Sequence, residues 1–79
     1  MNKEDILQYI NDALEEEHGE PIGYEDTLIS SGVDSFGLTM VLVNIDHKYS
    51  IYPKEVFSTL NFAEITANDV IERVLNGDK

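Results

Sequence analysis

The sequence predicts an all-α fold, a small bundle of three main helices and one short helix. Apolar residues recur at spacings of three and four along long segments, as they do on helices that bury one face. No segment alternates apolar and polar residues in the manner of a half-buried strand. With 79 residues the chain has the size of one domain, so we expect a single domain over residues 1–79.

The first helix is expected from about Lys3 to His18. Its inward face is formed by apolar residues at the spacing of an amphipathic helix, namely Ile6, Leu7, Ile10, Ala13 and Leu14. Asn2 is placed to cap its start, and Gly19 followed by Pro21 is expected to stop it. The following loop has enough apolar side chains that we expect it to pack across the helices; these are Ile22, Tyr24, Leu28 and Ile29.

The second helix is expected over Ser35–Tyr49, with Asp34 as its N-cap. It carries two stripes of apolar side chains, where a surface helix normally has one. The stripe expected in the core consists of Leu38, Leu42, Ile45 and Tyr49. The second stripe consists of Phe36, Met40 and Val43. Two interpretations of this second stripe stay open: it is buried by packing on two sides, or it is an exposed surface for a partner.

Two further helices are expected in the last third of the chain. Pro53 breaks the second helix and suits the start of a short helix over 54–58. The last helix is expected from Asn61 to about Gly77, since Asn61 and Glu64 have the spacing of a capping box. Its inward-facing residues are expected to be Phe62, Ile65, Val70, Val74 and Leu75.

The chain is strongly acidic, because 16 aspartates and glutamates against 5 lysines and arginines give a formal net charge of -11 at pH 7. This charge repels nucleic acid and anionic membranes and attracts a partner with a basic patch. It also disfavours self-association, so we expect a monomer. The sequence has no cysteine, no apolar stretch long enough to span a bilayer and no signal-peptide pattern at its start, so we expect a cytoplasmic protein without membrane insertion.

The segment Gly32-Val33-Asp34-Ser35-Phe36 resembles the G-x-D-S-[LIF] motif of acyl and peptidyl carrier proteins. The rest of the chain resembles the same family in register. Asp26-Thr27-Leu28 stands in the loop ahead of the motif, a long helix follows Ser35, and Pro53 opens a short helix. A terminal helix from Asn61 completes a resemblance that covers almost the whole chain. It implies an acyl-carrier-like bundle and a specialised, discrete member of this phosphopantetheine-binding family.

The resemblance implies that Ser35 is the attachment site of a 4′-phosphopantetheine arm and that the protein is not an enzyme. A phosphopantetheinyl transferase would move this group from coenzyme A to the Ser35 hydroxyl. Asp34 matches the family aspartate that helps to place Mg²⁺ during the transfer, and no metal is expected in the free protein. An acyl or aminoacyl group would then travel as a thioester to enzymes of fatty-acid, polyketide or related pathways. The start of a helix suits this role, because its N–H groups and dipole favour a phosphate.

The second helix departs from that of fatty-acid carriers, in which several acidic residues after the serine pair with basic enzymes. Within 35–48 only Asp46 is acidic. We therefore expect a more apolar contact with acyl-loading and acyl-using enzymes, formed by Phe36, Met40, Val43, Asp46 and His47. Charge reversal at Met40 or Val43 should weaken turnover by the cognate partner and leave the modification of Ser35 largely intact.

Two other functions are alternatives to the carrier. An acidic helical interaction module without a prosthetic group would bind a basic protein through charge and the second stripe, and it should tolerate Ser35→Ala. A small serine hydrolase would need a histidine within hydrogen-bond reach of Ser35, and only His18 and His47 are available. The hydrolase is the weakest of the three, because Val33 replaces the glycine that a nucleophile elbow needs two residues before its serine.

Overall fold

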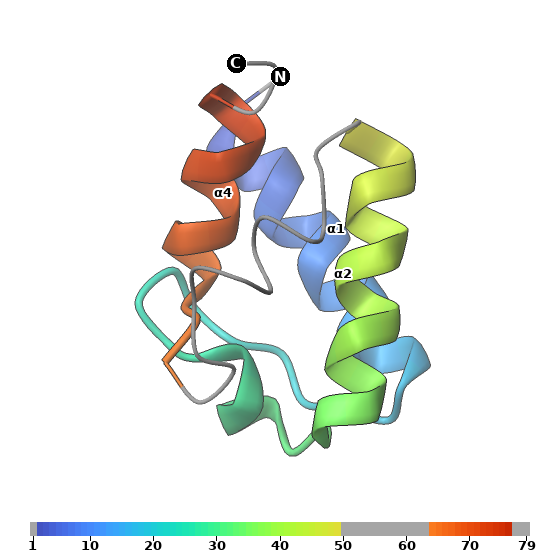
Figure 1. Ribbon diagram of the computed structural model, residues 1–79. Helices are drawn as coiled ribbons and strands as arrows, with labels where there is room; N and C mark the ends of the chain where they lie inside the picture. Colours follow the sequence, from blue (N-terminus) through green and yellow to red (C-terminus); the bar gives the residue numbers. More distant parts are fainter. Residues whose placement is uncertain (1, 50–63, 77–79) are drawn as a thin grey trace.

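The computed structural model describes residues 2–49 and 64–76, and these residues have an all-α architecture (Figure 1). The α-helices are α1 (Lys3–Glu16), α2 (Ser35–Tyr49) and α4 (Ala67–Asn76), and a 3-10 helix, η1 (Leu28–Ser31), precedes α2. α1 and α2 run in opposite directions, so the end of α1 and the start of α2 lie at the same end of the molecule (Figure 1). The short helix predicted over 54–58 and the inward position predicted for Phe62 lie outside the described residues.

The start of α1 has the predicted cap. The Asn2 side chain accepts a hydrogen bond from the Asp5 N–H at 2.9 Å, which satisfies one of the helix's unpaired donors. The inward face is also confirmed, because Leu7 packs partly buried against the core and the other predicted residues are buried. Those buried residues are Ile6, Ile10, Ala13 and Leu14.

The end of α1 differs from the prediction in position and in mechanism. The helix ends at Glu16, and His18 takes a left-handed backbone with a φ of 67°. The N–H groups of His18 and Gly19 donate to the carbonyls of Glu15 and Leu14, at 2.9 and 2.8 Å. This is a Schellman ending, in which the left-handed residue is usually glycine. Here His18 holds that conformation, so Gly19 does not stop the helix by its backbone freedom.

The loop after α1 packs against the helices, as its apolar residues predict. Ile22 is buried, and its N–H donates to the Asn11 side chain at 2.9 Å while the Asn11 amide donates back to its carbonyl at 3.1 Å. Leu28 is fully buried at the start of η1, whereas Ile29 is 40% exposed. Gly32 ends η1 with a φ of 93°, a backbone angle that favours glycine. The loop thus contributes side chains to the core, and its last turn at Gly32 leads directly to the start of α2.

The last helix begins later than predicted. Ile65 lies before the helix, and α4 begins at Ala67. The capping box is formed by Thr66 and Asp69: the Asp69 N–H donates to Thr66 Oγ1 at 3.1 Å, and the Thr66 N–H donates to Asp69 Oδ2 at 3.0 Å. The expected helix start at Asn61 is therefore wrong, because 64–66 do not continue a helix.

Contacts with the loop hold the chain extended before α4. Ile65 is fully buried outside any helix, and an isolated antiparallel bridge joins Thr66 to Thr27. Three backbone N–H groups donate between the two segments: Leu28 to Ile65 at 2.8 Å, Ala67 to Asp26 at 3.1 Å and Asn68 to Tyr24 at 2.9 Å. These long-range bonds compete with local helix formation, and they set where α4 begins.

The buried side chains of the described elements form one hydrophobic core. α2 contributes Leu38, Val41, Leu42 and Ile45, and Tyr49 packs partly buried against them. The predicted core stripe is confirmed, with Val41 as an addition that neither stripe contained. α4 contributes Ala67, Val70, Ile71 and Val74. Leu75 is 43% exposed, so its expected inward position is wrong.

Candidate functional site

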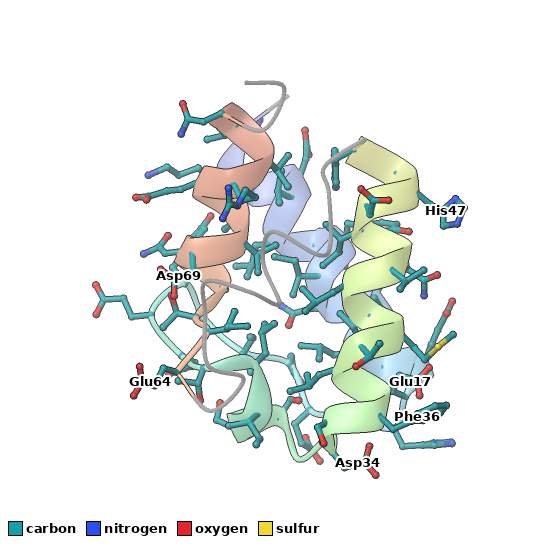
Figure 2. All side chains as sticks on the ribbon, viewed as in Figure 1. Glu17, Asp34, Phe36, His47, Glu64 and Asp69 are labelled. Atoms are coloured by element: carbon teal, nitrogen blue, oxygen red, sulfur yellow. The ribbon has the colours of Figure 1, made fainter. Side chains whose placement is uncertain are left out.

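The Asp34-Ser35 pair forms the start of α2 at one end of the molecule (Figure 2). Asp34 Oδ1 accepts the Gly37 N–H at 2.8 Å, and the Asp34 carbonyl accepts the Leu38 N–H at 2.9 Å. Asp34 is therefore the helix cap that the sequence predicts. Both Asp34 and Ser35 are exposed, so Ser35 is accessible from solvent in the first turn of the helix.

Val33, the residue before the cap, is buried between two glycines. A Cβ atom on Gly19 or on Gly37 would come closer to the Val33 side chain than real Cβ atoms come to their neighbours. Gly19 belongs to the turn that ends α1, and Gly37 belongs to the first turn of α2. The Glu20 N–H also donates to the Ser31 carbonyl at 2.9 Å. This packing holds the end of α1 against the start of α2.

Glu17, the C-cap residue of α1, lies beside the site, although nothing in its sequence position reveals this. Its Oε1 is 3.5 Å from the point that a Cβ atom on Gly37 would occupy, and Asp34 Oδ1 is 3.4 Å from the same point. The Glu17 carboxylate thus borders the first turn of α2, at the end of the molecule where Asp34 lies (Figure 2). Gly37 is the one sequence signal, since glycine inside a helix costs about 1 kcal/mol relative to alanine and often marks a close approach.

The second apolar stripe of α2 lies on the surface near the site. Phe36 is 74% exposed and Met40 is 39% exposed, while Val43 is half-buried. His47 is exposed and continues the same face at helical spacing, and Asp46 is half-buried at the margin of that face. Figure 2 shows Phe36 and His47 projecting to the same outer side of α2. The exposed interpretation of this stripe therefore holds for its first two residues.

The other end of α2 is held by aromatic side chains. The rings of Tyr9 and Tyr49 meet edge to face with centroids 5.7 Å apart. The Lys48 ammonium lies 5.4 Å from the Tyr9 centroid and 5.9 Å from that of Tyr49. The Tyr9 hydroxyl donates to the Asn44 carbonyl at 3.2 Å. Burial, with smaller contributions from Asp5 and Tyr9, raises the pKa of Tyr49.

The Ser35 end offers a hydroxyl, neighbouring carboxylates and the N–H groups of a helix start. Within 2–49 and 64–76, no three histidine, aspartate or glutamate side chains are grouped closely enough to hold a metal ion. His47 lies about 18 Å along the helix axis from Ser35 at 1.5 Å per residue, so these two do not form a serine–histidine pair. None of the described helices is long and apolar enough to cross a bilayer. The arrangement can present a hydroxyl to an enzyme that transfers a group to it.

No protein-family model, curated protein or solved structure matches this chain. A functional assignment therefore depends on the motif around Ser35 and on the geometry of the helix end that carries it. The features that bear on function are the capped and exposed Asp34-Ser35 pair, the glycine packing that holds it, and the exposed Phe36 and Met40 beside it.

Proposed function

We propose that this protein is an acyl carrier protein, which carries an acyl or aminoacyl group as a thioester on a 4′-phosphopantetheine arm attached to Ser35. The observation that carries the proposal is the Asp34-Ser35 pair at the exposed start of α2, where Asp34 caps the helix. The motif over 32–36 supports it, because the carrier family has its modified serine at the matching position. In this proposal the protein is a non-catalytic cytoplasmic carrier of a fatty-acid, polyketide or related pathway.

The residues around Ser35 suit the attachment of a phosphate group. α2 has 15 residues, and the start of such a helix carries about half a positive elementary charge, which favours an anion. One oxygen of Asp34 accepts the Gly37 N–H, and in this proposal its exposed carboxylate would help to hold Mg²⁺ while the group is transferred. When bound, the arm would supply the thiol that this cysteine-free chain lacks. The chain itself would hold one hydroxyl at a defined and accessible place.

Acyl-loading and acyl-using enzymes would contact the exposed apolar face of α2, formed by Phe36, Met40, Val43 and His47 with Asp46 at its margin. Met40→Glu should weaken acyl transfer by the cognate enzyme about tenfold, because an apolar residue that the enzyme would cover becomes an unpaired charge. Met40 is the better test position than Val43, since it is the more exposed of the two and its change spares the core.

The test is the intact mass of the protein after incubation with coenzyme A, Mg²⁺ and a broad-specificity phosphopantetheinyl transferase. We expect a gain of one phosphopantetheine group, absent in Ser35→Ala and retained in Ser30→Ala, an exposed serine just ahead of the motif. Circular dichroism establishes that each variant is folded. If several transferases leave the folded protein unmodified, the proposal is wrong and an acidic interaction module is the better account.

Two substitutions of Asp34 separate its structural role from its role in the transfer. Asn caps a helix about as well as Asp, so Asp34→Asn should keep the melting temperature while slowing modification of Ser35. Asp34→Ala removes the cap as well and should cost about 1 kcal/mol of stability. Equal modification rates for the wild type and Asp34→Asn would show that Asp34 is only a cap.

A further inference from the structure

An open cavity lies between α1 and the last turn of α2, away from the start of α2 that carries Ser35 (Figure 1). Its volume is about 490 Å³, which is within the range of small-molecule sites, about 300–1,000 Å³. Its lining consists of two aromatic rings, two carboxylates, one amide and one ammonium, namely Asp5, Gln8, Tyr9, Asp12, Lys48 and Tyr49. The proposed carrier function uses none of these residues.

Tyr9 and Tyr49 (the tyrosine pair) form two walls of this cavity. Their ring planes make an angle of 88°, and their centroids are 5.7 Å apart. The Tyr9 ring is held in place, because its hydroxyl donates to the Asn44 carbonyl at 3.2 Å. Both tyrosines are half-buried, so each ring keeps part of its surface open to solvent. Because the face of an aromatic ring is electronegative, two rings arranged in this way can attract one cation together.

The tyrosine pair already attracts one cation, the ammonium of Lys48. Its nitrogen lies 5.4 Å from the Tyr9 centroid and 5.9 Å from the Tyr49 centroid, close to the outer limit of about 6 Å for a cation–π contact. Lys48 is exposed, so its side chain can swing into water without uncovering the core. A lysine ammonium is also strongly hydrated and stands on a flexible stem, which makes it a weak occupant of an aromatic site. Lys48 is therefore an internal cation that an external cation can replace.

Two carboxylates of α1 border the same cavity and favour a positively charged ligand. Asp5 and Asp12 stand on one face of the helix with Gln8 between them, and Asp12 Oδ1 accepts the Gln8 amide at 3.0 Å. Burial first, and the Asp5 charge second, raise the pKa of Tyr49, so the Asp5 carboxylate acts on the phenol of the neighbouring helix. An anionic ligand would be repelled by both carboxylates and by the formal net charge of -11.

We propose that this cavity binds a small ligand with a quaternary ammonium group, which contacts the tyrosine pair, Asp5 and Asp12 once Lys48 has moved aside. A quaternary ammonium suits aromatic rings better than a lysine ammonium does, because its methyl groups leave the charge weakly hydrated. Aromatic side chains are the common recognition elements for choline and for methylated ammonium groups. The inference does not depend on the proposed function, because the cavity and Ser35 share no residue.

The test titrates the protein with choline in about 0.15 M NaCl and follows the tyrosine ring protons by NMR, since the salt screens non-specific attraction to the net charge. We expect the Tyr9 and Tyr49 rings to shift together with a dissociation constant of about 1 mM, because two exposed rings give a weak site. Tyr24, which does not line the cavity, should stay unchanged. The neutral isostere of choline, with a tert-butyl group in place of the trimethylammonium group, should bind about tenfold more weakly or not at all. Equal binding of the isostere would overturn the proposal, because the site would then recognise apolar shape and not charge.

A variant of Lys48 gives the sharpest test, because the proposal requires that losing this residue of the site strengthens binding. Lys48→Gln should lower the dissociation constant of choline about threefold, since the internal competitor is gone. The matched control is Lys3→Gln, which makes the same change in the first turn of α1 outside the cavity and should leave the dissociation constant nearly unchanged. A dissociation constant that is the same or higher in Lys48→Gln would overturn the proposal.

The carboxylates are tested on the same scale. Asp12→Asn keeps an oxygen for the Gln8 amide and removes the charge, so it should raise the dissociation constant of choline about threefold. Glu16→Gln, a charge loss at an exposed residue of α1 that does not line the cavity, is its control. Asp12 and Lys48 are both exposed, so these variants leave the core intact, and circular dichroism checks that they are folded. If neither tyrosine of the pair shifts at about fifty times the expected dissociation constant, the proposal is wrong and the carrier function is unaffected.

Discussion

The two ends of α2 are held by different kinds of contact. At its start, Val33 packs between two glycines, Asp34 caps the helix, and Ser35 and Phe36 face solvent. At its end, the rings of Tyr9 and Tyr49 meet beneath the Lys48 ammonium. The first end is fixed by a valine side chain that packs against two glycines, and the second by large side chains that cover one another.

This difference shows how the start of a helix can be packed against a neighbouring helix while its first residues stay exposed to solvent. Small residues let the start of α2 sit against the end of α1 without covering Ser35, so Ser35 stays exposed. Aromatic side chains in place of these glycines would cover more of the surface around Ser35. At the other end of α2, the contact is made by two aromatic rings, Tyr9 and Tyr49, and by the Lys48 ammonium over them.

The largest expected effect is at the glycine-packed end. Gly37→Ala should lower the free energy of unfolding by about 1–2 kcal/mol, because the new methyl collides with Val33 and outweighs the better helix propensity of alanine. Denaturant unfolding followed by circular dichroism measures this. Gly23→Ala is the control, since a Cβ there meets only Asp26 Oδ2 at 3.4 Å. If Val33→Ala does not partly rescue Gly37→Ala in a double-mutant cycle, the two side chains are not in conflict.

The aromatic end should respond less strongly to a single change. Tyr9→Phe keeps the ring contacts and removes the hydrogen bond from the Tyr9 hydroxyl to the Asn44 carbonyl, so stability should fall by about 1 kcal/mol. Tyr24→Phe is a matched control on a half-buried tyrosine of the loop. Urea midpoints that fall equally in both variants would mean that the hydrogen bond is not what anchors this end.

The turn that joins α1 to the site carries a residue in an unfavourable conformation. His18→Gly should raise the free energy of unfolding by about 0.5–1 kcal/mol, because the left-handed backbone at φ 67° costs an L-residue more than it costs glycine. His18→Ala keeps the Cβ atom and should give no gain. A thermal melt compares the two variants, and equal melting temperatures would mean that the His18 side chain offsets the cost of its backbone.

The smallest expected effect is the pH dependence of the aromatic end. Burial, Asp5 and Tyr9 raise the folded-state pKa of Tyr49 above its usual value of 10.0. The folded protein then holds the phenolic proton more tightly than the unfolded chain, so this contribution is present below about pH 10 and is lost as pH rises through the folded pKa. Between pH 9 and 11, Tyr49→Phe should lose less stability than wild type. The measurement is the free energy of unfolding of the two proteins at each pH. If it changes with pH in the same way for both, Tyr49 has the same pKa in the folded and the unfolded chain.

Local signals in the sequence predict most of the fold. Asp34 and Asn2 cap their helices as expected, because a cap depends on residues within one turn. The start of α4 could not be found in this way. Asn61 with Glu64 and Thr66 with Asp69 have the same spacing in the sequence, and long-range bonds such as that from the Leu28 N–H to the Ile65 carbonyl favour a helix start at Ala67. That bond joins segments far apart in the chain.

The candidate site divides in the same way. Asp34, Ser35 and Phe36 are found from the sequence, because their motif is contiguous. Glu17 is not, since it reaches the site through the packing of Val33 against Gly19 and Gly37. Gly19 illustrates the difference most clearly. Its position after the first helix predicts that it stops the helix, but the left-handed backbone belongs to His18. What requires glycine at position 19 is the Val33 side chain, which leaves no room for a Cβ atom there.

The hydrogen bonds between the loop and the start of α4 have a consequence for how the molecule opens. The Leu28, Ala67 and Asn68 amides all donate across the same junction, so undocking of α4 from the loop would release all three to water. Their exchange with deuterium should therefore follow one shared opening event. Undocking of α4 would then loosen η1, and through Gly32 the turn that leads to Ser35. We therefore expect these bonds to couple the docking of α4 to a segment about forty residues earlier in the chain.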